Sequence, residues 1–194
     1  MTELSQNHCS IISLVELCLH GNQAAMLQLV ERSQGLVFRL CLRMLGHQQD
    51  AEDIAQETLI RMFRSLHCWD QERRFEPWLL AIASNRCRTL LAQRARRPNW
   101  QLLDDSLPET SLAENSADLL AEEIGCALQI IPANLREAFV LFHEHEMSYA
   151  EIAEILDRPL GTIKTWIHRA RRQLVQRLQN RQVLEKSTYA LQAV

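Results

Sequence analysis

The stretch SYAEIAEILDRPLGTIKTWIHRARRQLVQR, residues 148–177, decides the fold of this chain. Ser148 followed by Glu151 predicts a capping box at the start of a helix. The apolar residues that follow fall on one helical face: Tyr149, Ile152, Ala153 and Leu156. Residues 157–161 contain a proline and a glycine, which end this helix and predict a sharp turn. We expect Thr162 to cap the next helix.

The second helix of this stretch combines an apolar stripe with a basic surface. The stripe consists of Ile163, Ile167, Ala170 and Leu174. Much of the remaining surface consists of Lys164, Thr165, His168, Arg169, Arg171 and Arg172. A short helix, a glycine-containing turn and a basic second helix are typical of the helix-turn-helix that reads the DNA major groove. The alternative is an ordinary helical hairpin with a solvated basic face, because runs of charge are usually only solvated.

Composition favours an all-helical protein with one domain or two small ones. The 194 residues are 47% hydrophobic and include only five glycines and five prolines, so the chain can bury a core with few helix breakers. The net charge of −3 hides a strong segregation. Residues 73–97 hold seven arginines and one acid, residues 104–123 hold seven acids and no lysine or arginine, and residues 158–181 hold seven basic residues and no acid. A local basic patch matters more than the total charge when the partner is a phosphate backbone.

Cysteine usage and hydropathy indicate a cytoplasmic protein. None of the six cysteines forms a CxxC pair, so we expect buried thiols rather than a disulfide framework. We expect no signal peptide and no membrane insertion, since the apolar run at residues 10–19 is too short to span a membrane. His143 and His145 lack further ligands at set spacings, so we expect no metal. No pattern indicates a cofactor, a nucleophilic triad, a Walker loop or paired catalytic carboxylates.

Helical periodicity divides the rest of the chain. It predicts helices over about 11–19, 23–45, 50–66, 77–92, 117–130 and 134–143. We expect Gly46 to stop the second helix, Asp50 to cap the third and Asn134 to cap the last. Residues 67–74 form a polar loop. The periodicity fades over residues 98–116, whose prolines, serines and acids are typical of a flexible linker.

Three stretches in this order resemble the extracytoplasmic-function (ECF) sigma factors of bacterial RNA polymerase. They are DAEDIAQETLIRMFRSL at 50–66, FEPWLLAIASNRCRTLL at 75–91 and IPANLREAFVLFHEHEMSYAEIAEILDRPLGTIKTWIHRARRQL at 131–174. The resemblance implies an all-α protein with sigma region two at residues 10–97, an acidic linker at 98–116 and sigma region four at 117–182. It also implies a protein that is not itself an enzyme. Its partners would be core RNA polymerase, promoter DNA as duplex and melted strand, and an anti-sigma factor.

The resemblance assigns roles to three groups of residues. Contact with core polymerase would come from Asp50, Asp53, Gln56 and Glu57, beside an apolar edge at residues 59–62. The minus-ten element would meet Trp69, Arg73, Arg74, Asn85, Arg86 and Arg88, with the loop around Trp69 capturing a flipped base. The minus-thirty-five element would meet Lys164, Thr165, His168, Arg169 and Arg172. Without the resemblance, the first group reads as a solvated first helical turn and the loop as an exposed connector.

Two other classes of protein fit parts of the pattern. A plain helix-turn-helix repressor would dimerise on a DNA palindrome without polymerase. A protein-interaction adaptor with merely solvated basic faces would show no salt-dependent DNA binding. The linker acids Asp104, Asp105, Glu109, Glu114 and Asp118 either mimic the charge of nucleic acid in a basic channel or only keep a tether soluble.

Overall fold

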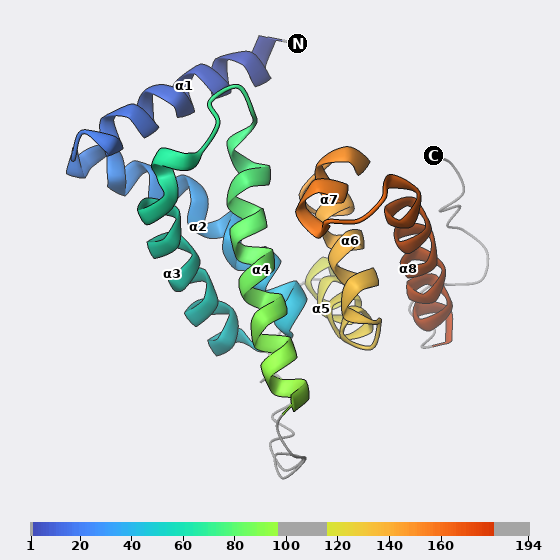
Figure 1. Ribbon diagram of the computed structural model, residues 1–194. Coiled ribbons are helices and arrows are strands. Elements are labelled where there is room, and N and C mark those ends of the chain that lie inside the picture. The colour runs from blue at the N-terminus through green and yellow to red at the C-terminus, as the bar shows by residue number, and fades with distance from the viewer. Residues whose placement is uncertain (1, 97–115, 181–194) are drawn as a thin grey trace. The chain divides into compact units, whose positions relative to one another are not determined.

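The computed structural model describes residues 2–96 and 116–180. These residues form helices joined by short turns, and they divide into two compact units, one built on α1 to α4 and the other on α5 to α8 (Figure 1). The expected all-α fold with two small helical domains is therefore confirmed. Most of the expected linker, residues 98–115, lies outside the described residues, and Ser116 begins α5.

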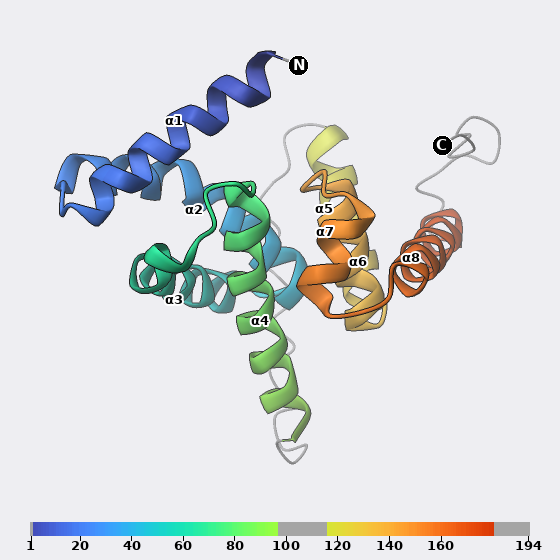
Figure 2. The ribbon, with the colours of Figure 1, turned by 45° about the horizontal axis from the view of Figure 1, so that its top comes forward.

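Domain one consists of α1 (Thr2–Leu19), α2 (Gln23–Leu45), α3 (Gln48–Ser65), the short 3-10 helix η1 (Leu66–Cys68) and α4 (Phe75–Arg96). Helix α2 is the centre of the domain, because α1, α3 and α4 all pack against it. Helices α3 and α4 also contact each other and run side by side (Figures 1 and 2). The apolar side chains between these helices include Leu29, Leu40, Met44, Met62, Leu79 and Leu80, none of which is exposed to solvent.

Both ends of α2 have the capping residues that are usual for helices, whereas the start of α3 does not. The Asn22 side chain accepts a hydrogen bond from the backbone N–H of Ala25 at 3.0 Å and so caps α2. Gly46, at φ 72°, ends α2 as predicted. The predicted cap of α3, Asp50, is wrong. His47 stands at that position in extended backbone, and its Nδ1 accepts from the Asp50 N–H at 3.4 Å.

The side chains of five cysteines are described, and all five are free thiols: Cys18, Cys41, Cys68, Cys87 and Cys126. Cys18, Cys41 and Cys87 are buried in domain one, as expected, and burial raises the pKa of the Cys18 thiol. Cys68 departs from the expectation because it lies exposed on η1. The three buried thiols therefore serve as small core residues.

Domain two consists of α5 (Ser116–Gln129), α6 (Ala133–His143), α7 (Tyr149–Leu156) and α8 (Leu160–Asn180). Helix α8 packs on both α5 and α6. Its predicted stripe is confirmed, because Ile163, Ile167, Ala170 and Leu174 are all buried. A ridge of apolar side chains every three to four residues fixes which side of α8 remains in solvent.

One of the two helix caps predicted for α6 and α7 is confirmed. The capping box of α7 is confirmed: the Ser148 N–H donates to the Glu151 carboxylate at 2.8 Å, and the Glu151 N–H donates to Ser148 Oγ at 3.2 Å. The predicted Asn134 cap is wrong, since Pro132 stands at the N-cap of α6 and its carbonyl accepts from the N–H groups of Leu135 and Arg136.

The turn between α7 and α8 differs from the prediction. Asp157, at φ 50°, makes the left-handed step that the sequence assigned to a glycine. Gly161 already belongs to α8, because this helix begins at Leu160 directly after Pro159. Thr162 is therefore not a cap. It lies in the first turn, where its N–H donates to the Pro159 carbonyl at 2.8 Å.

Candidate functional site

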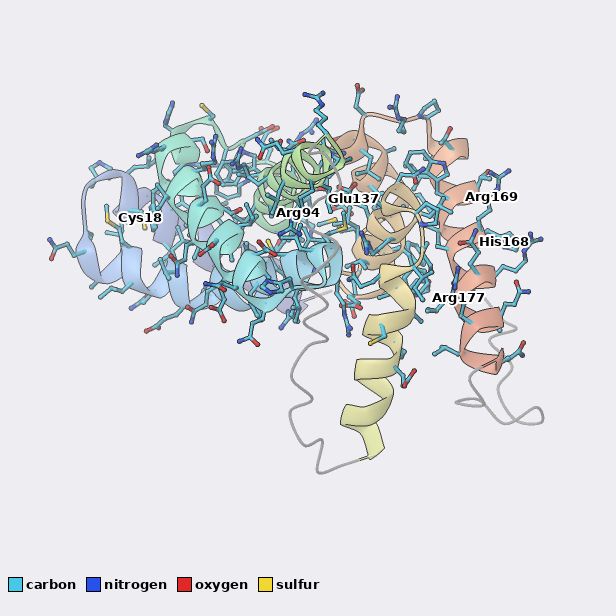
Figure 3. All side chains as sticks on the ribbon, turned by 90° about the horizontal axis from the view of Figure 1, so that it is seen from below. Cys18, Arg94, Glu137, His168, Arg169 and Arg177 are labelled. Carbon is cyan, nitrogen blue, oxygen red and sulfur yellow. The ribbon has the colours of Figure 1, made fainter. Side chains whose placement is uncertain are left out.

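The outer face of α8 presents a row of polar and basic side chains. All five residues predicted to read duplex DNA are exposed: Lys164, Thr165, His168, Arg169 and Arg172. Figure 3 shows His168 and Arg169 extending from the side of α8 that faces away from α6. The structure thus brings the predicted group together on one accessible face, which suits insertion of a helix into a major groove.

Aromatic rings fix the start of α8 within domain two. Tyr149 of α7 stacks on Phe142 of α6, with ring centroids 4.7 Å apart. The ammonium of Lys164 lies 5.7 Å from the centroid of the Tyr149 ring, a cation–π distance. Lys164 is therefore oriented by α7 while its side chain remains exposed. Nothing in the sequence spacing of Tyr149 and Lys164 indicates this contact.

His143 and Arg171 form a second contact between α6 and α8. Arg171 Nη2 lies 3.2 Å from His143 Nε2. A guanidinium has only donors, so Nε2 accepts the hydrogen bond and the imidazole is neutral. Burial and the neighbouring charge of Arg171 lower the pKa of His143. Arg171 is thus turned towards α6, unlike the five predicted DNA contacts.

This contact predicts a pH dependence of domain stability. The pKa of His143 in the folded chain is lowered. As the pH falls through the usual histidine value of about 6.5, the unfolded chain therefore takes up a proton first. We expect the melting temperature to fall between pH 7.5 and 5.5, and to fall less in His143→Gln, which keeps a hydrogen-bond acceptor but does not titrate. Thermal melts followed by circular dichroism measure the difference, and identical pH profiles would contradict it.

Only part of the predicted polymerase-binding face of α3 is exposed and free of contacts with α4. Asp53 and Gln56 are exposed and make no hydrogen bond or ion pair within the described parts of the chain. Ile60, 53% exposed, lies one turn further on the same side. The predicted apolar edge at residues 59–62 needs correction, because Met62 is fully buried and Ile60 is the exposed apolar residue. The face thus combines two polar side chains with one apolar side chain.

The other two members of that group are tied to α4. Asp50 pairs with Arg94 of α4. Glu57 pairs with Arg86 at 2.6 Å. Because residues 50 and 57 of α3 meet residues 94 and 86 of α4, the two helices run antiparallel. The structure therefore joins a predicted polymerase contact, Glu57, to a predicted DNA contact, Arg86.

The loop before α4 differs most from the sequence-based view. Trp69 is only 6% exposed, and its ring packs edge-on against Phe75 at 5.3 Å between centroids. The prediction that Trp69 captures a base is wrong for this conformation, because a buried indole offers no stacking face. Arg73 and Arg74 remain exposed, each near an acid: Arg73 lies 3.6 Å from Asp70, and Arg74 lies 3.7 Å from Glu76.

The middle of α4 places two predicted DNA contacts beside each other. Asn85 is exposed, and its Oδ1 accepts a hydrogen bond from Arg88. Cys87 lies between Arg86 and Arg88 in sequence but points into the core. An amide and a guanidinium held together on a helix surface can offer donors to a base edge and to a phosphate.

Two negative observations concern the described residues alone. No group of three or more histidine, cysteine or acidic side chains gathers there in a metal-binding arrangement. No helix among them combines the length and apolar character needed to span a bilayer.

Comparison with known proteins identifies both domains. Residues 29–97 match the family Sigma-70 region 2, and residues 121–174 match the family Sigma-70, region 4. The chain is 33% identical over 177 residues to the ECF RNA polymerase sigma factor SigW of Bacillus subtilis, covering 82% of this chain and 92% of SigW.

Two solved structures share the fold. The structure of CnrH in complex with the cytosolic domain of CnrY matches with a TM-score of 0.65 and 26% identity, over 86% of this chain and 96% of that chain. The sigma factor RpoE of Bartonella quintana, solved in complex with the anti-sigma factor NepR, matches with a TM-score of 0.63 and 21% identity, over 78% and 95%. The chain belongs to the ECF sigma factors, which direct core RNA polymerase to specific promoters and initiate transcription there.

Proposed function

We propose a division of labour in which domain one binds core polymerase and the opened minus-ten strand, and domain two reads the minus-thirty-five duplex. The boundaries proposed for these regions are residues 10–97 and 117–182. The observation that carries this proposal is that each domain presents its own exposed polar face, on α3 and α4 in one case and on α8 in the other. The chemistry of RNA synthesis belongs to the polymerase, and the sigma factor acts in the cytoplasm without being an enzyme.

The polymerase contact lies on α3 around Asp53, Gln56 and Ile60. Polar groups of this kind fix the register of two surfaces, whereas the exposed isoleucine supplies burial energy of about 25 cal/mol per Å². Asp50 and Glu57 act mainly through α4, because both are ion-paired there.

We expect the double variant Asp53→Ala with Gln56→Ala to stay folded and to lose about tenfold or more in affinity for core polymerase. Truncation of a residue that carries an interface costs about 1 kcal/mol or more, and such residues cluster near its centre. The matched control is Glu31→Ala with Gln34→Ala, an acid and an amide with the same spacing on the exposed side of α2. Fluorescence anisotropy of labelled sigma factor titrated with core enzyme measures both. Equal affinities of the two double variants for core polymerase would show that this face of α3 does not contact the polymerase.

The opened strand follows Asn85, Arg88 and the exposed Arg73 and Arg74. Single-stranded DNA needs cations for its backbone and amide or aromatic groups for its bases. With Trp69 buried, Asn85 is the side chain best placed to contact a base edge. Arg86 contributes to the same strand once it leaves Glu57.

An anti-sigma factor completes the set of proposed partners. It would cover the open face of α3, since blocking that face prevents polymerase binding. The complex of the structurally similar RpoE of Bartonella quintana with NepR shows that a protein of this fold accepts such a partner.

Run-off transcription with purified core polymerase and genomic promoter fragments tests the proposal as a whole. Transcripts that appear only when this protein is added support it. A protein that binds a DNA palindrome tightly but never binds core enzyme would instead be the helix-turn-helix repressor considered above.

A further inference from the structure

We propose that Glu57 is a positioning residue that holds Arg86 away from DNA until a strand arrives. When Arg86 then moves to the strand, Arg61 remains as the partner of Glu57. This inference rests on the proposed contact of Arg86 with the opened strand. It concerns a single carboxylate on α3 that serves two arginines.

The two oxygens of Glu57 are shared between the two arginines. Arg86 Nη2 lies 2.6 Å from Oε2, whereas Arg61 Nη2 and Nε lie 3.0 and 3.2 Å from Oε1. Partial burial raises the pKa of Glu57, but the hydrogen bonds from Arg86 and Arg61 outweigh it and lower that pKa below its usual value. Glu57 is therefore firmly ionised, and it neutralises one of the two guanidinium charges.

The arrangement allows Arg86 to be exchanged at low cost. Breaking an ordinary partly buried ion pair leaves an uncompensated charge, which is strongly unfavourable. Here Arg61 would still hold Oε1 after Arg86 departs, so Glu57 would never be left unpaired. A DNA phosphate offers Arg86 the same kind of charge-assisted hydrogen bond that Glu57 gives it.

Exposure of the pair permits this exchange in place. The Arg86 side chain is 25% exposed and that of Glu57 is 36% exposed, so an incoming anion can reach the guanidinium without unfolding the helix. The Nε of Arg86 is buried and has no hydrogen-bond partner among the described residues, so its terminal nitrogen atoms form the group that exchanges. In the free protein this competition lowers the affinity for any single strand.

The test uses the full chain and a fluorescein-labelled single-stranded oligothymidylate, with binding followed by anisotropy at several salt concentrations. Glu57→Gln is compared with Glu52→Gln, which changes the net charge equally on the same helix. Among the described residues, Glu52 is hydrogen-bonded only to Gln48 of that helix. We expect Glu57→Gln to bind roughly three- to tenfold more tightly than Glu52→Gln, with a similar salt slope, because Arg86 contacts the bound strand in both variants. The advantage should vanish when Arg86→Ala is added to both.

The outcomes separate this inference from the function on which it rests. If Arg86→Ala weakens binding but the two glutamine variants bind equally, the positioning role of Glu57 is wrong and the DNA contact of Arg86 stands. If Arg86→Ala leaves binding unchanged, both are wrong. Circular dichroism confirms that each variant is folded.

A second pair of variants decides the matter if Glu57→Gln does not fold. Arg61→Gln leaves Glu57 with Arg86 alone and should tighten the hold on it. We expect oligothymidylate binding about two- to fivefold weaker than for Arg64→Gln, which removes an equal charge from the exposed last turn of α3. Equal binding by these two arginine variants would also overturn the inference.

Discussion

We expect replacement of Trp69 by alanine to destabilise domain one strongly instead of merely impairing strand opening. The indole is almost completely buried and packs against Phe75, which in turn lies 5.5 Å from Trp78 between ring centroids. Removing a buried tryptophan costs about 3–5 kcal/mol. A small domain has a total stability of about 5–15 kcal/mol, so this loss consumes a large part of it.

Urea denaturation followed by circular dichroism measures this effect. The matched control is Cys68→Ala, one residue earlier and exposed, which should change stability by less than about 0.5 kcal/mol. A Trp69→Ala variant of parental stability that still fails to open promoters would restore the base-capture role and contradict the core role seen here.

The double change Lys164→Ala with Arg169→Ala should reduce minus-thirty-five-dependent transcription by roughly a hundredfold. Both side chains lie on the exposed face of α8. A good base contact discriminates by about 1–3 kcal/mol, and each lost phosphate contact lowers the salt slope by about 0.9. Neither residue belongs to the buried stripe, so the fold should survive.

The promoter itself supplies a sharp control for this second prediction. Scrambling the minus-thirty-five element should strongly reduce transcription by the parent protein. It should change transcription by the double variant little, because that variant no longer recognises the element. Arg171→Ala is the matched single-charge control on the same helix, since its guanidinium is turned to His143. A double variant as sensitive to scrambling as the parent would show that α8 does not read this element.

Features governed by nearby residues were predictable from the sequence. The Ser148–Glu151 capping box and the Gly46 stop depend on residues within one helical turn, and both are confirmed. The buried stripe of α8 follows from spacing alone. The caps of α3 and α6 were missed because His47 and Pro132 are not the residue types that usually cap helices.

Features that depend on tertiary contacts were not predictable. Trp69 looks like an exposed loop residue until Phe75 is seen to cover it. Glu57 and Arg86 are far apart in sequence, and only the antiparallel packing of α3 and α4 brings them together. The contact of Lys164 with Tyr149 likewise requires knowing how α7 meets α8. The roles assigned to individual residues at the polymerase and DNA surfaces stay predictions.

The aromatic contacts at the start of α8 bear on how promoter specificity can change in evolution. Phe142, Tyr149 and Lys164 all belong to domain two, so these contacts orient the start of α8 within its own domain. When the side chains that support a binding surface belong to the same domain, the surface keeps its geometry if that domain is moved to another protein. If α8 reads the minus-thirty-five element as proposed, we expect that exchanging domain two for that of another sigma factor would change the duplex preference and leave domain one intact.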